Sequence, residues 1–168
     1  MAAAELSLTE WVVLALVGES PTHGFAIARE LRPESDLGRI LTVHRPLVYR
    51  ALDRLRDAGL VTEAATEPGD AGPTRTVMKI TRRGRAQLKT WFVTPVDHIR
   101  DLRIEFLVKL RLTERAGKDP AVLVTAQQAE LAATFATLAA ESDDDDVVDQ
   151  WRRHNATAAA TFLTHLAP

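Results

Sequence analysis

The side chains best suited to chemistry in this sequence are two arginines that follow Pro46. Arg50 and Arg54 are preceded by Leu47 at a spacing of i, i+3 and i+7, which places all three on one side of a helix. A guanidinium group makes bidentate hydrogen bonds to guanine or neutralises a phosphate, and leucine can lie against a thymine methyl group. The pattern predicts a surface that contacts double-stranded DNA. The alternative is a solvated face on which Asp53 partly compensates Arg50.

A second basic segment, residues 75–89, carries six basic residues and no acidic one. Its first part alternates as a strand does, with Thr76, Met78 and Ile80 predicted to pack and Arg75, Val77 and Lys79 to face outward. Outward Arg75 and Lys79 suit contacts to phosphate or to the minor groove. The remaining basic residues suit either solvent or a distal phosphate: Arg82, Arg83 and Arg85.

These residues must be positioned by three helices and a hairpin. Ser7 and Glu10 have the spacing of a capping box before a first helix, and Pro33 ends a short second helix over about 23–31. Thr22 is the candidate N-cap of the second helix, and Phe25 is expected in the core. A third helix over about 45–58 buries Val48, Leu52 and Leu55 and ends at Gly59. Strands over 60–66 and 74–80 flank a turn-forming segment.

The rest of the sequence favours helices. Thr81 is a predicted cap for a helix that Pro95 stops, and Asp97 and Asp119-Pro120 are predicted to begin two more. Asp143 to Asp146 precede the last helix, where the helix dipole favours negative charge. The alternative, a metal-binding acidic cluster, lacks the glycine and distal glutamate of a calcium loop.

This order of elements predicts a mainly α fold with a small β-hairpin. Residues 1–94 form a winged helix-turn-helix DNA-binding domain, in which the third helix enters the major groove, and residues 95–168 form a helical dimerisation region.

Composition excludes several classes of protein. The 168 residues are 46% hydrophobic and 26% charged, with a mean hydropathy of −0.09, as in globular proteins. With no cysteine, disulfides, thiolate metal sites and thiol nucleophiles are excluded. The histidines show no metal spacing, and we expect no metal or cofactor. Neither a Gly-x-Ser-x-Gly elbow nor a phosphate-binding glycine-rich loop occurs, so no enzyme is predicted.

Charge is divided unevenly along the chain. Residues 1–94 carry 13 Lys+Arg against 11 Asp+Glu, and residues 95–168 carry 8 against 12, which leaves a net charge of −2. The basic excess lies in the half predicted to bind DNA. No stretch resembles a signal peptide or membrane span, so a cytoplasmic location is expected.

Several segments together closely resemble the PadR family of bacterial transcriptional regulators. These are His23-Gly24-Phe25 after Pro21, the run from Val48 to Val61, and Gly72-Pro73 through Ile80-Thr81 with Gly84. The segment 103–110 also resembles the helical dimerisation region of longer members. The resemblance implies a homodimeric repressor, often of nearby genes, that a small-molecule effector releases. It also implies that Tyr49 approaches the DNA backbone, and Arg45 is predicted beside it at the rim of the groove.

Three amphipathic C-terminal helices carry more apolar stripes than one small core needs, which predicts a twofold partner. The candidate interface residues are Leu102, Phe106, Leu110, Trp151 and Phe162. Packing within the chain is the alternative for each. A symmetric dimer places its recognition helices about 34–36 Å apart and predicts a pseudo-palindromic operator.

Trp91 and Phe92 are candidates for an effector pocket between subunits, with core packing as the alternative. A winged-helix module that binds proteins without reading DNA is the alternative function.

Overall fold

The structure is a computed structural model that describes residues 6–68, 74–140 and 146–167. The chain packs as two compact units, residues 1–91 and 92–168. That these units are independent domains with a boundary at residue 94 stays a prediction.

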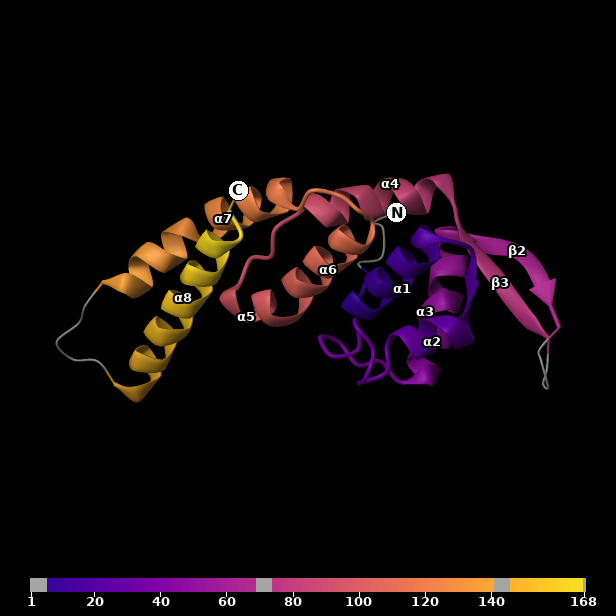
Figure 1. Ribbon diagram of the computed structural model, residues 1–168, viewed down its shortest axis with the longest axis horizontal. Coiled ribbons are helices and arrows are strands. Elements are labelled where there is room, and N and C mark those ends of the chain that lie inside the picture. The colour runs from indigo at the N-terminus through magenta and orange to yellow at the C-terminus, as the bar shows by residue number, and fades with distance from the viewer. Residues whose placement is uncertain (1–5, 69–73, 141–145, 168) are drawn as a thin grey trace. The chain divides into compact units, whose positions relative to one another are not determined.

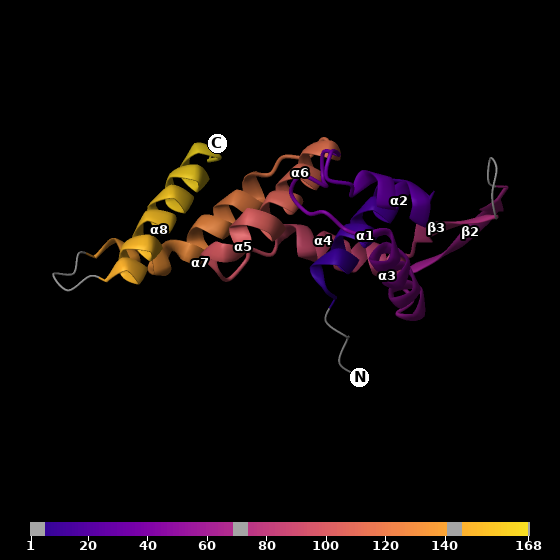
Figure 2. The same ribbon diagram turned by 90° about the horizontal axis from the view of Figure 1, so that it is seen from below.

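The first unit is a winged helix-turn-helix fold, as the sequence predicts. Three helices pack together, and a three-stranded antiparallel sheet in the order β1-β3-β2 extends from them (Figures 1 and 2). The elements are α1 (Leu8–Glu19), β1 (Thr22–His23), α2 (Gly24–Glu30), α3 (Arg45–Asp57), β2 (Val61–Glu67), β3 (Arg75–Ile80) and α4 (Arg82–Val93). We call β2 and β3 the wing. The last two residues of α4 belong to the second unit.

α1 forms the centre of the first unit. The predicted capping box is present: Ser7 Oγ accepts a hydrogen bond from Glu10 N, and Glu10 Oε2 accepts one from Ser7 N at 2.7 Å. Residues 12–17 are all buried. Burial of this uninterrupted run fits a helix enclosed by its neighbours rather than one lying on the surface.

α3 packs its predicted apolar stripe against α1. Val48, Leu52 and Leu55 are buried, which leaves the opposite side of the helix exposed. Gly59 follows the helix with a φ of 68°, in the left-handed region that glycine adopts without strain, and Leu60 N donates to Leu55 O at 2.8 Å. The sequence-based interpretation of this segment is confirmed.

Around α2 the structure corrects two predictions. His23 caps the helix, since its Nδ1 accepts a hydrogen bond from Ala26 N at 3.1 Å, and Thr22 and His23 pair with β3 as a third strand. A strand of two residues is too short to show alternation in the sequence. Phe25, expected in the core, is 36% exposed because it faces away from the packed side of the helix.

The wing also departs from simple alternation. Val77, predicted to face outward with Arg75 and Lys79, is buried. It pairs with His23 of β1 and with Ala65 of β2, next to a register shift between Glu63 and Ala65. Thr76, predicted to pack, is exposed, and Val77 and Met78 are both buried, so β3 does not divide into one packed and one open face.

The second unit is helical. Its elements are α5 (Ile99–Asp101), η1 (Leu102–Phe106, a π-helical turn), α6 (Leu107–Arg115), α7 (Ala121–Ala139) and α8 (Val147–His165). α7 and α8 lie side by side as a helical hairpin (Figures 1 and 2).

The helix starts of this unit are partly as predicted. Asp119 Oδ1 accepts a hydrogen bond from Ala121 N at 2.9 Å, and Asp146 Oδ1 accepts from Val148 N and Asp149 N. His98 takes the N-cap position of α5 without a side-chain hydrogen bond, so the predicted cap at Asp97 is wrong. The predicted acidic run at Asp143–Asp145 lies outside the described residues.

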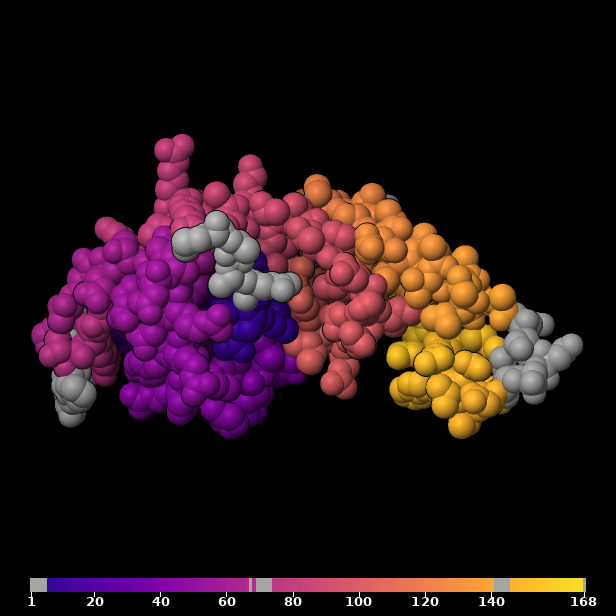
Figure 3. Space-filling view, turned by 180° about the vertical axis from the view of Figure 1, so that it is seen from behind, coloured from indigo at the N-terminus to yellow at the C-terminus, as the bar shows by residue number. Residues whose placement is uncertain are grey.

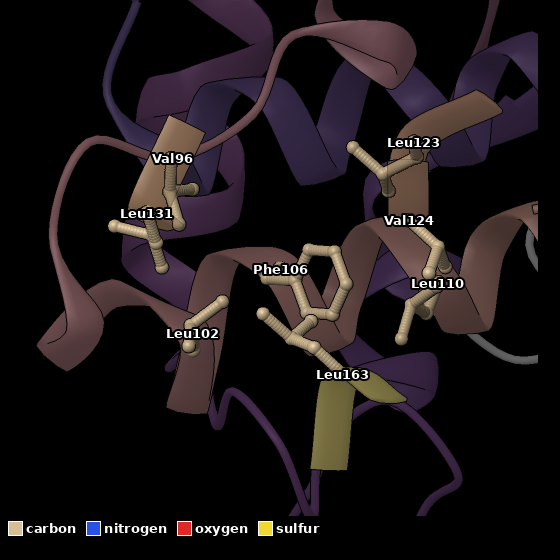
Figure 4. Packing of buried hydrophobic residues seen from close by; sticks show 8 residues of the cluster. All are labelled: Val96, Leu102, Phe106, Leu110, Leu123, Val124, Leu131 and Leu163. Atoms are coloured by element: carbon tan, nitrogen blue, oxygen red, sulfur yellow. The ribbon is translucent and has the colours of Figure 1, made fainter. Parts of the chain in front are cut away.

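The core of the second unit uses three residues predicted for the dimer interface. Phe106 lies at its centre, and Leu102 and Leu110 flank it from neighbouring turns (Figure 4). All three are at most 7% exposed. Packing within the chain, the alternative considered for these residues, is therefore what the structure shows, because a single unit already needs these side chains to close its core.

Two buried polar side chains hold the segment that follows α4. Gln127 donates from Nε2 to Val96 O and accepts at Oε1 from Val96 N, both at 2.8 Å. Lys109 donates from Nζ to Thr94 O at 2.9 Å and pairs with Glu105 at 2.7 Å. Through these contacts α6 and α7 fix the backbone of residues 94–96.

Among the described helices, none combines the length and the apolar character needed to cross a bilayer.

Replacing Gln127 by alanine is expected to destabilise the protein. The substitution removes both partners of a buried backbone N–H and C=O, each of which costs about 1–3 kcal/mol when left unsatisfied. We expect Gln127→Ala to lower the free energy of unfolding in urea by about 2–4 kcal/mol. Gln128→Ala, which removes one partly buried hydrogen bond to Leu163 O, is the matched control and should cost less. Equal losses in the two variants would contradict the role assigned to Gln127.

Candidate nucleic-acid interface

The exposed side of α3 carries most of the residues predicted to contact DNA. Leu47 is 41% exposed and Tyr49 is 40% exposed, and the side chains of Arg45, Arg50 and Arg54 are exposed with them. An apolar side chain among cations is an unusual surface feature, and this surface lies on the helix that winged folds place in a major groove.

Arg50 is the arginine of this surface that is open to a ligand. Within the described parts of the chain its side chain makes no ion pair or hydrogen bond. Asp53, the carboxylate considered as its partner, pairs instead with Arg56 at 3.1 Å. Arg50 therefore presents a guanidinium that Asp53 does not pair with, and a contact of this face with DNA rather than with solvent stays a prediction.

Arg54 has a different environment. Its Nη1 lies 2.9 Å from Oε1 of Glu10, whose side chain is only 4% exposed, while the Arg54 side chain is 54% exposed. Glu10 Oε2 meanwhile accepts from both the backbone N and the Oγ of Ser7. Through Nη1 the guanidinium of Arg54 links α3 to α1, and about half of the Arg54 side chain remains exposed to solvent. Sequence reasoning missed this contact because the capping box already accounted for Glu10.

Arg45 and Arg75 meet at an aromatic cluster. The guanidinium carbon of Arg45 lies 5.5 Å from the ring centroids of both Phe25 and Tyr49, and that of Arg75 lies 5.3 Å from the Phe25 centroid. Arg45 Nη2 also donates a long hydrogen bond, 3.5 Å, to Tyr49 Oη. Arg75, predicted on the exposed side of the wing, is half-buried, and the ring of Phe25 is one of its contacts.

A groove of about 380 Å³ runs between α2, α3 and the wing in the first unit. Arg45, Tyr49 and Arg75 line it, together with Asp53 and the other residues of the cluster. The groove joins the start of α3 to β3 of the wing, the two elements predicted to contact DNA.

The other basic residues differ in how they are held. Lys79 on the wing is exposed and has no side-chain partner in the described regions. Arg83 Nη1 donates to Ala58 O at 3.3 Å, whereas Arg82 and Arg85 are exposed. Long side chains from this part of α4 stand clear of the surface (Figure 3). The choice between solvent and phosphate for these residues stays open.

The two effector candidates lie in different surroundings. Trp91 is 5% exposed and stacks on Trp11, with ring centroids 5.5 Å apart and planes inclined by 7°. Core packing, the alternative considered for it, is what the structure shows, because the two indole faces cover each other. Phe92 is half-buried, and Lys118 Nζ lies 6.0 Å from its ring centroid.

The proposed dimer residues of α8 are exposed. Trp151 is 69% exposed and Phe162 is 40% exposed.

No group of three or more potential metal ligands occurs within residues 6–68, 74–140 and 146–167.

Comparison with known proteins identifies the winged-helix unit. Residues 13–90 match the model of the transcriptional regulator PadR-like family, and this range spans α1 to α4. This winged-helix unit is therefore PadR-like. The family that this unit matches consists of DNA-binding transcriptional regulators rather than enzymes.

Solved structures show likenesses at low sequence identity. Bacillus subtilis PadR, crystallised with operator DNA, is 17% identical with a TM-score of 0.49, over 95% of this chain and 97% of that one. The smu.1604c protein of Streptococcus mutans UA159 is 14% identical with a TM-score of 0.46, over 93% and 96%.

A PadR-like transcription factor from Bacteroides fragilis is 25% identical with a TM-score of 0.40, over 48% of this chain and 73% of that one. A search of curated proteins found no match.

The different surroundings of Arg54 and Arg50 in the PadR-like unit predict different effects on stability. We expect Arg54→Ala to lower the free energy of unfolding by about 1–2 kcal/mol, because it leaves the buried Glu10 carboxylate without its cation. The value is smaller than for a fully buried pair because Arg54 is half exposed. Arg50→Ala, the matched control, should change it by less than about 0.5 kcal/mol. Urea unfolding followed by circular dichroism measures both, and indistinguishable midpoints would refute the structural role of Arg54.

Proposed function

We propose that this PadR-like regulator is a homodimeric repressor that binds a pseudo-palindromic operator through α3 and the wing and is released by a small molecule. The observation that carries the DNA-reading part is the exposed, uncompensated Arg50 beside Leu47 on α3. An unpaired guanidinium and an apolar side chain on one face match the hydrogen-bonding edge of guanine and the methyl group of thymine.

Each remaining contact follows from its place on the surface. Arg45 and Tyr49, at the start of α3, suit phosphates at the rim of the major groove. Arg54 suits phosphate through the part of its guanidinium that Glu10 leaves exposed. Arg75 and Lys79 of the wing suit the backbone or minor groove, and there they add affinity more than sequence discrimination.

A homodimer is supported by exposed apolar residues on α8. Val147 is 77% exposed, and Trp151 and Phe162 lie further along the same helix. Large apolar side chains left open on a helix are best covered by a partner, and a twofold copy presents the same surface. Such a dimer sets its two α3 helices about one turn of DNA apart, roughly 34–36 Å.

Repression and release by a small molecule are expected from the resemblance to the family. Phe92 is the remaining candidate for the effector site, since Trp91 is used in packing. A cytoplasmic location is part of the same proposal.

Charge reversal at Arg50 tests the DNA-reading surface. Fragments of the source genome are selected with the purified protein at physiological salt, and the enriched site is used in gel retardation. Loss of one bidentate arginine contact costs about 1–3 kcal/mol, or roughly five- to 150-fold in affinity, and an added negative charge costs more. We expect Arg50→Glu to abolish retardation at concentrations that saturate the wild type.

The matched control is Arg103→Glu, the same charge change at an exposed residue of η1. It should retain binding. Retardation by Arg50→Glu as strong as by the control would refute the assignment of α3. With the same fragment as promoter, wild-type protein should lower transcription in vitro, and increased transcript would make the protein an activator.

The dimer surface predicts a second effect of charge. Trp151→Asp places a carboxylate in the centre of the proposed apolar contact, and we expect sedimentation at micromolar concentration to shift from dimer toward monomer. Trp151→Phe keeps an apolar ring and should stay dimeric. A dimer that persists in Trp151→Asp with an unchanged dissociation constant would place the interface elsewhere.

A further inference from the structure

We propose that Phe25 is a positioning residue that holds Arg45 of α3 and Arg75 of the wing together as one binding site for the DNA backbone. The inference rests on the proposed DNA contacts of these two arginines. It adds a residue of α2 to the interface and makes the wing and the recognition helix act as one phosphate-binding unit.

The geometry places both cations on one ring. Arg45 and Arg75 lie 5.5 and 5.3 Å from the centroid of Phe25, within the range in which the ring quadrupole attracts a cation. The two guanidinium carbons are therefore no further apart than the sum of these distances. Arg45 belongs to α3 and Arg75 to β3, so the ring joins elements that the chain sequence separates.

The location of the ring is fixed by close helix packing. Gly24 precedes it, and a Cβ atom there would lie 2.9 Å from Tyr49 Cε1 and 3.2 Å from Leu52 Cδ1. At 2.9 Å a Cβ atom would clash with the Tyr49 ring, so the absence of a side chain at Gly24 allows α2 to approach α3 closely. This approach brings the next residue, Phe25, beside the start of α3.

The groove carries the guanidinium groups of Arg45 and Arg75. Arg45 has no carboxylate partner within the described residues. Of the two acids that line the groove, Asp53 is paired with Arg56, and Glu63 is exposed on β2. A guanidinium donates charge-assisted hydrogen bonds to phosphate oxygens, so two guanidinium groups beside one ring suit a phosphodiester of the DNA backbone.

Phe25 is not placed as a core residue. It is 36% exposed, whereas Ile27 and Ala28 of the same helix are at most 8% exposed. A role in holding the arginines explains why a large ring stands at this surface position, and it predicts that substitution affects DNA binding more than folding.

The first test compares two replacements of the ring. Phe25→Leu removes the π face and Phe25→Tyr keeps it. We expect Phe25→Leu to weaken operator binding about three- to tenfold at physiological salt, since two cation–π contacts are lost at a partly exposed site. Phe25→Tyr should bind like the wild type, and both variants should keep the wild-type thermal midpoint within a few degrees. Wild-type affinity in Phe25→Leu would overturn the proposal.

A double-mutant cycle separates positioning from direct contact. Phe25→Leu is measured in the wild type, in Arg45→Ala/Arg75→Ala, and in Lys79→Ala, whose residue has no contact with the ring. If Phe25 acts through the arginines, its effect disappears in the arginine background and persists in Lys79→Ala. A persistent effect in both backgrounds would mean that Phe25 contacts DNA itself or supports the fold, and the inference would fail.

The arginine variants distinguish this failure from failure of the proposed interface. Arg45→Ala and Arg75→Ala should each reduce the slope of log affinity against log salt by about 0.9 if each binds a phosphate. Unchanged slopes would refute the proposed contacts themselves. Reduced slopes with no coupling to Phe25 would leave those contacts standing and refute only the positioning role.

Discussion

The burial of one stripe of α3 against α1 determines the rest of the interface. Val48, Leu52 and Leu55 each gain about 1.5–3 kcal/mol from leaving water, which far exceeds what any single surface contact contributes. Once that side is buried, Leu47 and Arg50 must face outward. The Glu10–Arg54 pair then adds a second attachment between the same two helices and fixes the rotation of α3. The surface open to DNA is thus a consequence of the core.

What could be predicted from the sequence follows the same logic. The helix over 45–58, its glycine cap and the wing strands are local patterns with a physical period or a backbone requirement, and the structure confirms them. The exposure of Arg50 and Lys79 also follows from local patterns. The contacts of Arg54 with Glu10 and of Phe25 with two arginines join residues far apart in sequence, and no local pattern specifies them.

The second unit shows where amphipathic patterns are ambiguous. A stripe such as Leu102, Phe106 and Leu110 predicts burial but not the partner, and here the partner is the same chain. The π-helical turn over Leu102–Phe106 shifts the register of the side chains that follow it, which a period of 3.6 residues does not anticipate. The exposed residues of α8 are the apolar surface that the core leaves unused.

Charge placement matters more here than net charge. The chain is slightly acidic overall, with a net charge of −2, yet several arginines of the first unit are committed to defined partners: Glu10, Asp53, Ala58 O or aromatic rings. Cations held in place lose less conformational freedom when they bind phosphate than flexible surface lysines do. A modest number of fixed cations on α3 and the wing can therefore support binding without a strongly basic domain. In the proposed interface these fixed arginines hold the DNA backbone in register, and Arg50, which has no ion-pair partner among the described residues, discriminates between sequences.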